Sequence, residues 1–257
     1  MQLFSVLIII LLSGCGWKPC KEYRPPVCAS DYYLILLVDA PHLDHTSNLG
    51  LIQSIARREK RDVGHAWIYL QGIIDGKPYS IEGGHSGELG ICQAKYFDGI
   101  MNYIEYGEPF QTTHRSRYER NPIKYLWITQ NDGFFQNGSG GHTPTFSLKI
   151  DLTKEQFETI LTFIQPENYN YREYSLTHHQ CCTFVAQVAA LAGIYLDYQI
   201  TIPIDQHLKL GRTTYTLWQD RQYSTFTFGS VDILERSMMN LKKTPRTNFG
   251  ETSIGVH

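Results

Sequence analysis

The chain of 257 residues carries a formal net charge of -2 and has a sequence pI of about 6.5. Because it has no basic excess, it lacks the electrostatic field that draws proteins to nucleic acids. Its residues are 42% hydrophobic and 13% aromatic, with 17 Tyr. This composition excludes a disordered chain and predicts a folded core.

The N-terminus has the composition of an export signal. An apolar run from Leu3 to Leu12 is too short to cross a bilayer as a mature helix and lies where a secretory signal has its hydrophobic region. It ends in Leu12-Ser13-Gly14-Cys15, which resembles the lipobox of bacterial lipoproteins. The segment before the apolar run contains Gln2 but no Lys or Arg, although a positive charge is usual there. We expect a signal peptide over residues 1–15, lipid on Cys15 and anchoring to the membrane surface of the bacterial cell envelope. An ordinary cleaved signal and a retained anchor are the alternatives.

Residues 16–30 are rich in Pro and charge without an apolar period, which predicts a tether between the lipid and the folded part. Within it, Cys20 and Cys28 are close enough in sequence to pair in an oxidising compartment. We expect one domain over residues 31–240 and a loose polar tail over residues 241–257.

Several segments have the pattern of strands. Tyr32 to Ala40 is a continuous apolar run of strand length. The segments before and after Asp75-Gly76 predict a hairpin from Ala66 to Glu82, because Asp-Gly is a turn signal between strands. Further strands are expected at Asn102–Tyr106, Lys124–Thr129 and Thr145–Leu152, with a long glycine-rich connection, Asn131–His142, between the last two.

Two helices follow. Thr153 and Gln156 have the spacing of a capping box, in which each side chain bonds the backbone of the other residue, and Pro166 ends the apolar period. The second helix is expected from about Gln180 to Ala192, with Gly193 at its C-terminal end.

Cys181 and Cys182 stand at the start of this second helix, where the positive end of the helix dipole favours a thiolate. A cysteine nucleophile also needs a base, usually a histidine held by a third polar group. His65 opens an apolar strand, where it is costly without partners, and the next strand ends in Glu82. The hairpin is expected to bring both residues to the same end, so that Glu82 could fix the tautomer of His65.

The segments GHAWIYL, YSIEGG and CCTFVAQVAALAGI occur in the order found in a known family. They resemble the circularly permuted papain-like proteins of the NlpC type, a group that includes lecithin:retinol acyltransferase. The resemblance implies an α+β fold, with an antiparallel sheet and the nucleophile helix packed on it, and acyl transfer without a cofactor. It implies Cys181 as nucleophile, His65 as base and Glu82 as orienting residue. Cys182 is a rival in the next register, and Gln180 stands where the family often has Asn.

Other residues are weaker candidates. Gln180, His85 and Trp218 could contact substrate, although the glycines around His85 favour an exposed turn, and His114 and His142 have no context that singles them out. His178 and His179 beside the two cysteines do not have the usual spacing of zinc ligands, so no metal is expected.

Two functions remain open from the sequence. The first is a cysteine hydrolase or acyltransferase of the cell envelope, acting on an amide or ester of peptidoglycan peptide, peptide or lipid. The second is a surface lipoprotein that uses an inactive fold of this type for binding or structure, with Cys181 and Cys182 as small buried side chains.

Overall fold

A computed structural model describes residues 31–57, 63–87, 120–121 and 123–243. The expected signal peptide (residues 1–15), lipidation at Cys15, tether (residues 16–30) and strand Asn102–Tyr106 lie outside these residues, as does His114. The described part is a mixed α+β fold, built on one five-stranded antiparallel sheet. The predicted α+β class and the predicted antiparallel sheet are therefore confirmed.

The sheet has the strand order β4-β3-β2-β1-β5, and each pair of neighbours is antiparallel. Its strands are β1 (Tyr33–Asp39), β2 (His65–Ile74), β3 (Lys77–Ser86), β4 (Phe134–Asn137) and β5 (Phe146–Asp151). The end of β1 and the start of β2 lie at the same end of the sheet, because Asp39 pairs with His65.

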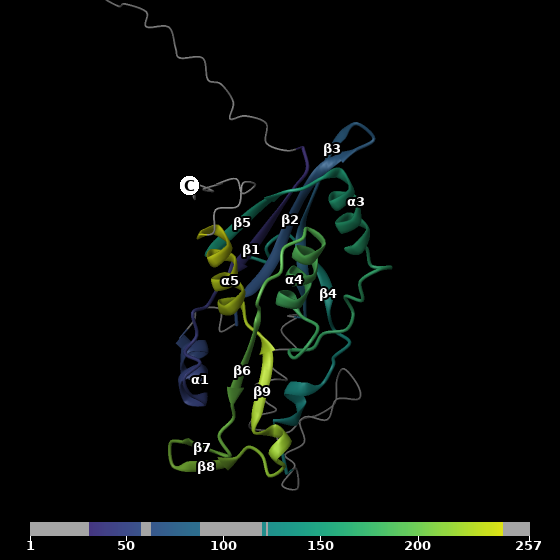
Figure 1. Cartoon of the computed structure of the whole chain (residues 1–257). Helices are drawn as coiled ribbons and strands as arrows, with labels where there is room; N and C mark the ends of the chain where they lie inside the picture. The colour runs from purple at the N-terminus through teal and green to yellow at the C-terminus, as the bar shows by residue number, and fades with distance from the viewer. Residues whose placement is uncertain (1–30, 58–62, 88–119, 122, 244–257) are drawn as a thin grey trace, which may run out of the picture.

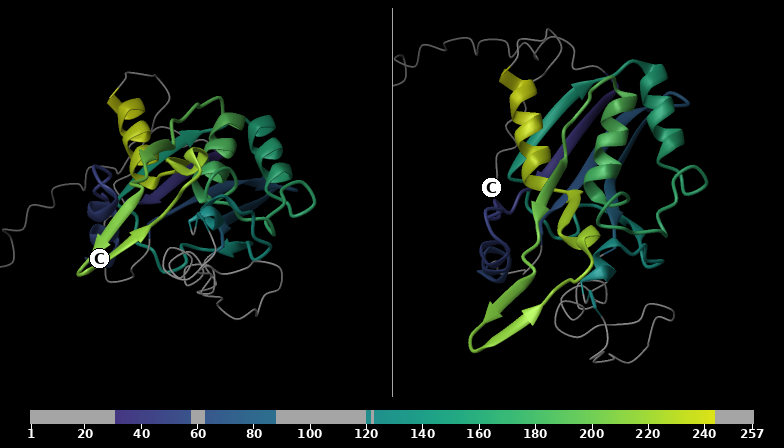
Figure 2. Two further views of the ribbon diagram at one scale, coloured as in Figure 1. Left: turned by 90° about the horizontal axis from the view of Figure 1, so that it is seen from below. Right: turned by 60° about the horizontal axis from the view of Figure 1, so that its bottom comes forward.

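Three helices cover one face of this sheet, as Figures 1 and 2 show: α3 (Lys154–Phe163), α4 (Cys181–Leu191) and α5 (Val231–Lys243). Helix α1 (Asn48–Arg57) lies beyond the end of β1. Short 3-10 helices form at η1 (Lys124–Trp127) and η2 (Arg221–Tyr223). Among the described residues, none of the helices combines the length and the apolar character needed to cross a membrane.

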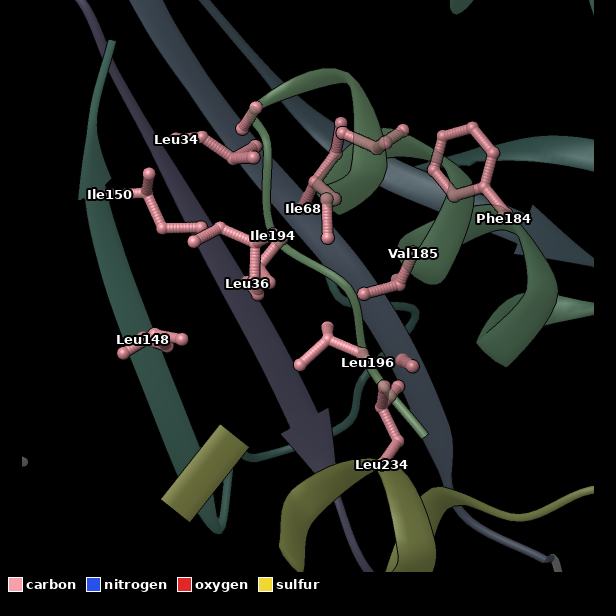
Figure 3. Close-up of a cluster of buried hydrophobic side chains, with 14 of the residues drawn as sticks. Leu34, Leu36, Ile68, Leu148, Ile150, Phe184, Val185, Ile194, Leu196 and Leu234 are labelled. Carbon is pink, nitrogen blue, oxygen red and sulfur yellow. The ribbon is translucent and has the colours of Figure 1, made fainter. Parts of the chain in front are cut away.

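The main hydrophobic core lies between the sheet and these helices (Figure 3). Alternate residues of the strands point into it, such as Leu34 and Leu36 of β1 and Ile68 of β2, all fully buried. Helix α4 contributes Phe184 and Val185, which are also fully buried. Burying an aliphatic or aromatic side chain of this size stabilises a fold by about 1.5–3 kcal/mol. The core therefore holds the start of α4 in a fixed place against β2 and β3.

A tight turn sets the register of the predicted hairpin. Asp75 and Gly76 both have positive φ, 51° and 72°, which is the conformation of a type I′ turn. This turn pairs Ile74 with Lys77 and, further along, Tyr69 with Glu82.

A second, smaller hydrophobic cluster lies beyond the main sheet. It is built on two antiparallel ribbons, one of β6 (Gln199–Pro203) and β9 (Thr225–Gly229), the other of β7 (His207–Leu210) and β8 (Thr213–Thr216). Its buried members are Ile123, Ile202, Ile204, Leu208, Leu217 and Phe226.

Most of the predicted strands of the main sheet are confirmed. Both predicted helices are also confirmed, as is the capping box of Thr153 and Gln156. Two expectations are wrong. The strand at Lys124–Thr129 is the 3-10 helix η1, and the glycine-rich connection contains β4. Near the expected end of the domain at residue 240, α5 runs to Lys243 and buries Leu234 and Met238.

Candidate active site

The candidate nucleophile Cys181 is the first residue of α4. Gln180 precedes it as the N-cap, with an extended backbone, and its side-chain Oε1 accepts the Cys182 N–H at 2.9 Å. The same oxygen accepts the Cys181 thiol at 3.1 Å. The cap therefore fixes both the start of the helix and the position of the first sulfur.

The Cys181 thiol lies beside the ring of His65. A hydrogen bond from the Cys182 thiol, together with the His65 ring and the Ala66 backbone N–H, holds the pKa of Cys181 well below its usual range, against the opposing effect of burial. Burial and the adjacent Cys181 sulfur raise the pKa of Cys182. Of the two cysteines, Cys181 is the one whose pKa the His65 ring lowers.

A close approach of two strands positions His65. Gly64, immediately before it, has a φ of 81°, and a Cβ at Gly64 would overlap the backbone oxygen of Asp39. Only glycine fits this position, where β2 begins directly beside the last residue of β1. The pairing of Asp39 with His65 follows from this approach.

His142 is the third side chain of the site. It comes from the connection between β4 and β5, and its ring centroid lies 5.0 Å from that of His65. Its Nδ1 lies 2.8 Å from Oδ2 of Asp39, and both residues are 9% exposed. The Asp39 carboxylate fixes the His142 ring, and that ring packs against His65.

The predicted contact between Glu82 and His65 is wrong, because the pairing of β2 with β3 places the two residues apart. Glu82 pairs with Tyr69, four residues further along β2 than His65, which corresponds to about 13 Å along the strand. The Glu82 carboxylate accepts the Trp67 indole N–H at 2.9 Å instead. Since Trp67 stacks on His65 with a ring distance of 5.8 Å, Glu82 supports the site through the indole.

His85 is fully buried in β3 and does not lie in an exposed turn. Its Nδ1 lies 3.0 Å from the Tyr169 hydroxyl, and its Nε2 lies 3.0 Å from the Tyr171 carbonyl oxygen. Burial and the nearby His179 lower the pKa of His85 to about 3. It is therefore neutral at physiological pH and holds the segment that leads into α4.

The remaining candidates lie elsewhere. Trp218 packs on the second hydrophobic cluster and donates its indole N–H to the Ile204 carbonyl at 2.8 Å. His178 bonds the hydroxyls of Ser175 and Thr177. Within the described ranges, no three His, Cys, Asp or Glu side chains are grouped so that they could hold a metal ion.

No family model matches the chain, and the curated proteins and the solved structures contain no match to it. What the site can do chemically therefore follows from the positions of its own side chains. Cys181, His65, His142 and Asp39 come from four separate elements or connections and meet at the start of α4. This set has the residue types that acyl transfer by a cysteine requires: a thiol, a histidine ring and a fixed polar group beside that ring.

Sequence reasoning missed Asp39 and His142. One signal was present for Asp39: a carboxylate ends a strand that is otherwise apolar, and such a group needs a partner when it is buried. No local pattern marks His142, because its partner Asp39 is 103 residues away in sequence.

Proposed function

We propose that the protein is a cysteine hydrolase or acyltransferase that works through a thioester on Cys181, and that its fold is a permuted papain-like arrangement of the NlpC type. The observation that carries the proposal is the position of the Cys181 thiol, which lies at the start of a helix and beside His65, where its pKa is lowered. A buried thiol without function has no need of a histidine beside it.

The steps follow from ordinary cysteine chemistry. The Cys181 thiol gives its proton to His65, and the thiolate attacks the carbonyl carbon, so that a C–S bond forms and the carbonyl electron pair moves to oxygen. The tetrahedral intermediate collapses, the C–N or C–O bond breaks, and His65 returns the proton to the leaving amine or alcohol. Water or a second acceptor then gives its proton to His65, attacks the thioester and releases Cys181.

His142 and Asp39 act as positioning residues in this proposal. A fixed ring against His65 restricts the orientation of the base, and the Asp39 carboxylate stabilises positive charge that develops on the two rings.

The proposed place of action is the bacterial cell envelope, with the chain anchored through lipid on Cys15. The proposed substrates are the amides and esters present there, such as peptidoglycan peptides, other peptides and acyl lipids. No separate observation favours the alternative of an inactive binding module.

A substrate screen with the full-length protein tests the proposal, starting with cell-wall fragments and acyl esters. Activity should fall by at least about 10³-fold in Cys181→Ser. The matched control is Cys182→Ser, which should keep activity, since its hydroxyl can replace the thiol that bonds Cys181. Full activity in Cys181→Ser, with loss in Cys182→Ser, would exchange the two roles and overturn the assignment.

A further inference from the structure

We propose that the side-chain amide of Gln180 donates a hydrogen bond to the carbonyl oxygen of the acyl substrate, and that Gly229 of β9 provides the space this amide needs. The inference rests on the proposed acyl transfer at Cys181. It names the group that would stabilise the negative charge on the substrate oxygen.

Gln180 has an unsatisfied hydrogen-bond donor. The residue is only 3% exposed, and its Nε2 has no hydrogen-bond partner among the described residues, whereas its Oε1 has two. A buried donor without an acceptor costs about 1–3 kcal/mol. Such a cost next to a nucleophile is expected where the acceptor arrives with the substrate.

The hydrogen bond from Cys182 fixes the orientation of the Gln180 amide. The Cys182 N–H requires an acceptor, so the oxygen of the amide must face α4 and the nitrogen must be the free end. From ordinary C=O and C–N bond lengths, the two ends of an amide are about 2.2 Å apart. Because Oε1 lies 3.1 Å from the Cys181 sulfur, Nε2 lies within about 5.3 Å of it. An oxygen on a carbon bonded to that sulfur can therefore come within about 3 Å of Nε2.

The Gln180 amide packs directly against Gly229 of β9. A Cβ at Gly229 would overlap Nε2 of Gln180 and would lie 3.2 Å from the Cys182 Cβ. Any side chain at residue 229 would thus push the amide out of its place. The ribbon of β6 and β9 in this way contributes to the candidate active site.

The test compares two reactions of Cys181 in the full-length protein by site-resolved mass spectrometry. Alkylation by iodoacetamide needs a thiolate but forms no oxyanion, whereas acylation by p-nitrophenyl acetate forms one. The informative quantity is the ratio of acylation rate to alkylation rate. Gln180→Glu keeps an acceptor for the Cys182 N–H and removes the donor, so this ratio should fall by about 100-fold. Gly229→Ala should lower it by at least about 10-fold.

Gln187→Glu is the matched control, because Gln187 is an exposed residue of the same helix, and it should leave the ratio unchanged. An unchanged ratio in a folded Gln180→Glu protein would overturn the role of Gln180. Slow alkylation and no acylation of the wild-type Cys181 would instead overturn the proposed function itself.

A measurement on the wild-type protein covers the case in which the variants do not fold. The aldehyde N-benzoylglycinal forms a thiohemiacetal with a reactive cysteine, and its oxygen stands where the oxyanion would be. With ¹⁵N-glutamine labelling, the Gln180 side-chain protons should move downfield when this adduct forms. An adduct without that shift would contradict the proposal, and the absence of an adduct would count against both the donor and the acyl-transfer function.

Discussion

Two buried histidines stand on neighbouring strands of the sheet, and their surroundings differ. His85 of β3 has both ring nitrogens engaged, by the Tyr169 hydroxyl and the Tyr171 carbonyl. His65 of β2 lies beside the Cys181 thiol and packs against His142, which a carboxylate holds. Burial alone therefore does not make a histidine a base. A base needs a proton donor on one side and a group that stabilises its charged form nearby.

The largest effect in this comparison is expected for His142→Ala. Loss of the ring that packs against His65 should lower the rate of Cys181 acylation by p-nitrophenyl acetate by about 10-fold to 100-fold. It should also shift the pH profile of Cys181 alkylation, which a purely structural residue would not move. His142→Asn, whose amide can still bond Asp39, should recover part of the rate. A rate equal to wild type in His142→Ala would show that His65 acts without this support.

A moderate effect is expected for the pH dependence of stability through His85. Its pKa in the folded protein is about 3, below the value of about 6.5 in an unfolded chain. A depressed histidine pKa means that the unfolded state binds the proton first, so this contribution to stability is complete above about pH 6.5 and falls as the pH drops toward 3. The loss should be at most about 1.4 kcal/mol per pH unit.

His85→Gln removes the titration and keeps a hydrogen-bonding side chain. Urea unfolding between pH 4 and 7 should therefore show a shallower pH dependence for this variant than for wild type. Equal slopes would mean that His85 binds its proton as readily in the folded protein as in the unfolded chain, and its burial would then not distinguish it from an exposed histidine.

The smallest effect is expected for Glu82→Gln. The side chain can still accept the Trp67 indole N–H, and it has no direct place beside His65. Acylation and alkylation of Cys181 should both stay within about 3-fold of wild type. A loss as large as that of His142→Ala would restore Glu82 as the orienting residue.

The sequence predicts the parts of this molecule that depend on local patterns. Helix α4 and its cap could be read from apolar spacing and from the residues at its ends, and the hairpin from its Asp-Gly turn. Cys181 and His65 could be proposed because each begins such an element. Helix α5 was missed, although Leu234, Met238 and Leu241 have helical spacing.

Contacts between segments that are far apart in the sequence could not be predicted from the sequence. The error over Glu82 came from the register, since a shift of a few residues along a strand moves a side chain away from its supposed partner. The pairing of His142 with Asp39 depends on β5 closing against β1, which brings the two segments together only in the folded sheet.

The central claim is that Cys181 is a thiolate activated by His65. The most direct measurement is iodoacetamide labelling of each cysteine of the full-length protein between pH 5 and 9, by site-resolved mass spectrometry, in wild type and in His65→Ala. We expect rapid labelling of Cys181 at pH 6 that slows markedly in His65→Ala. Labelling that rises only near the ordinary thiol pKa of about 8.5, equally in both proteins, would contradict the account.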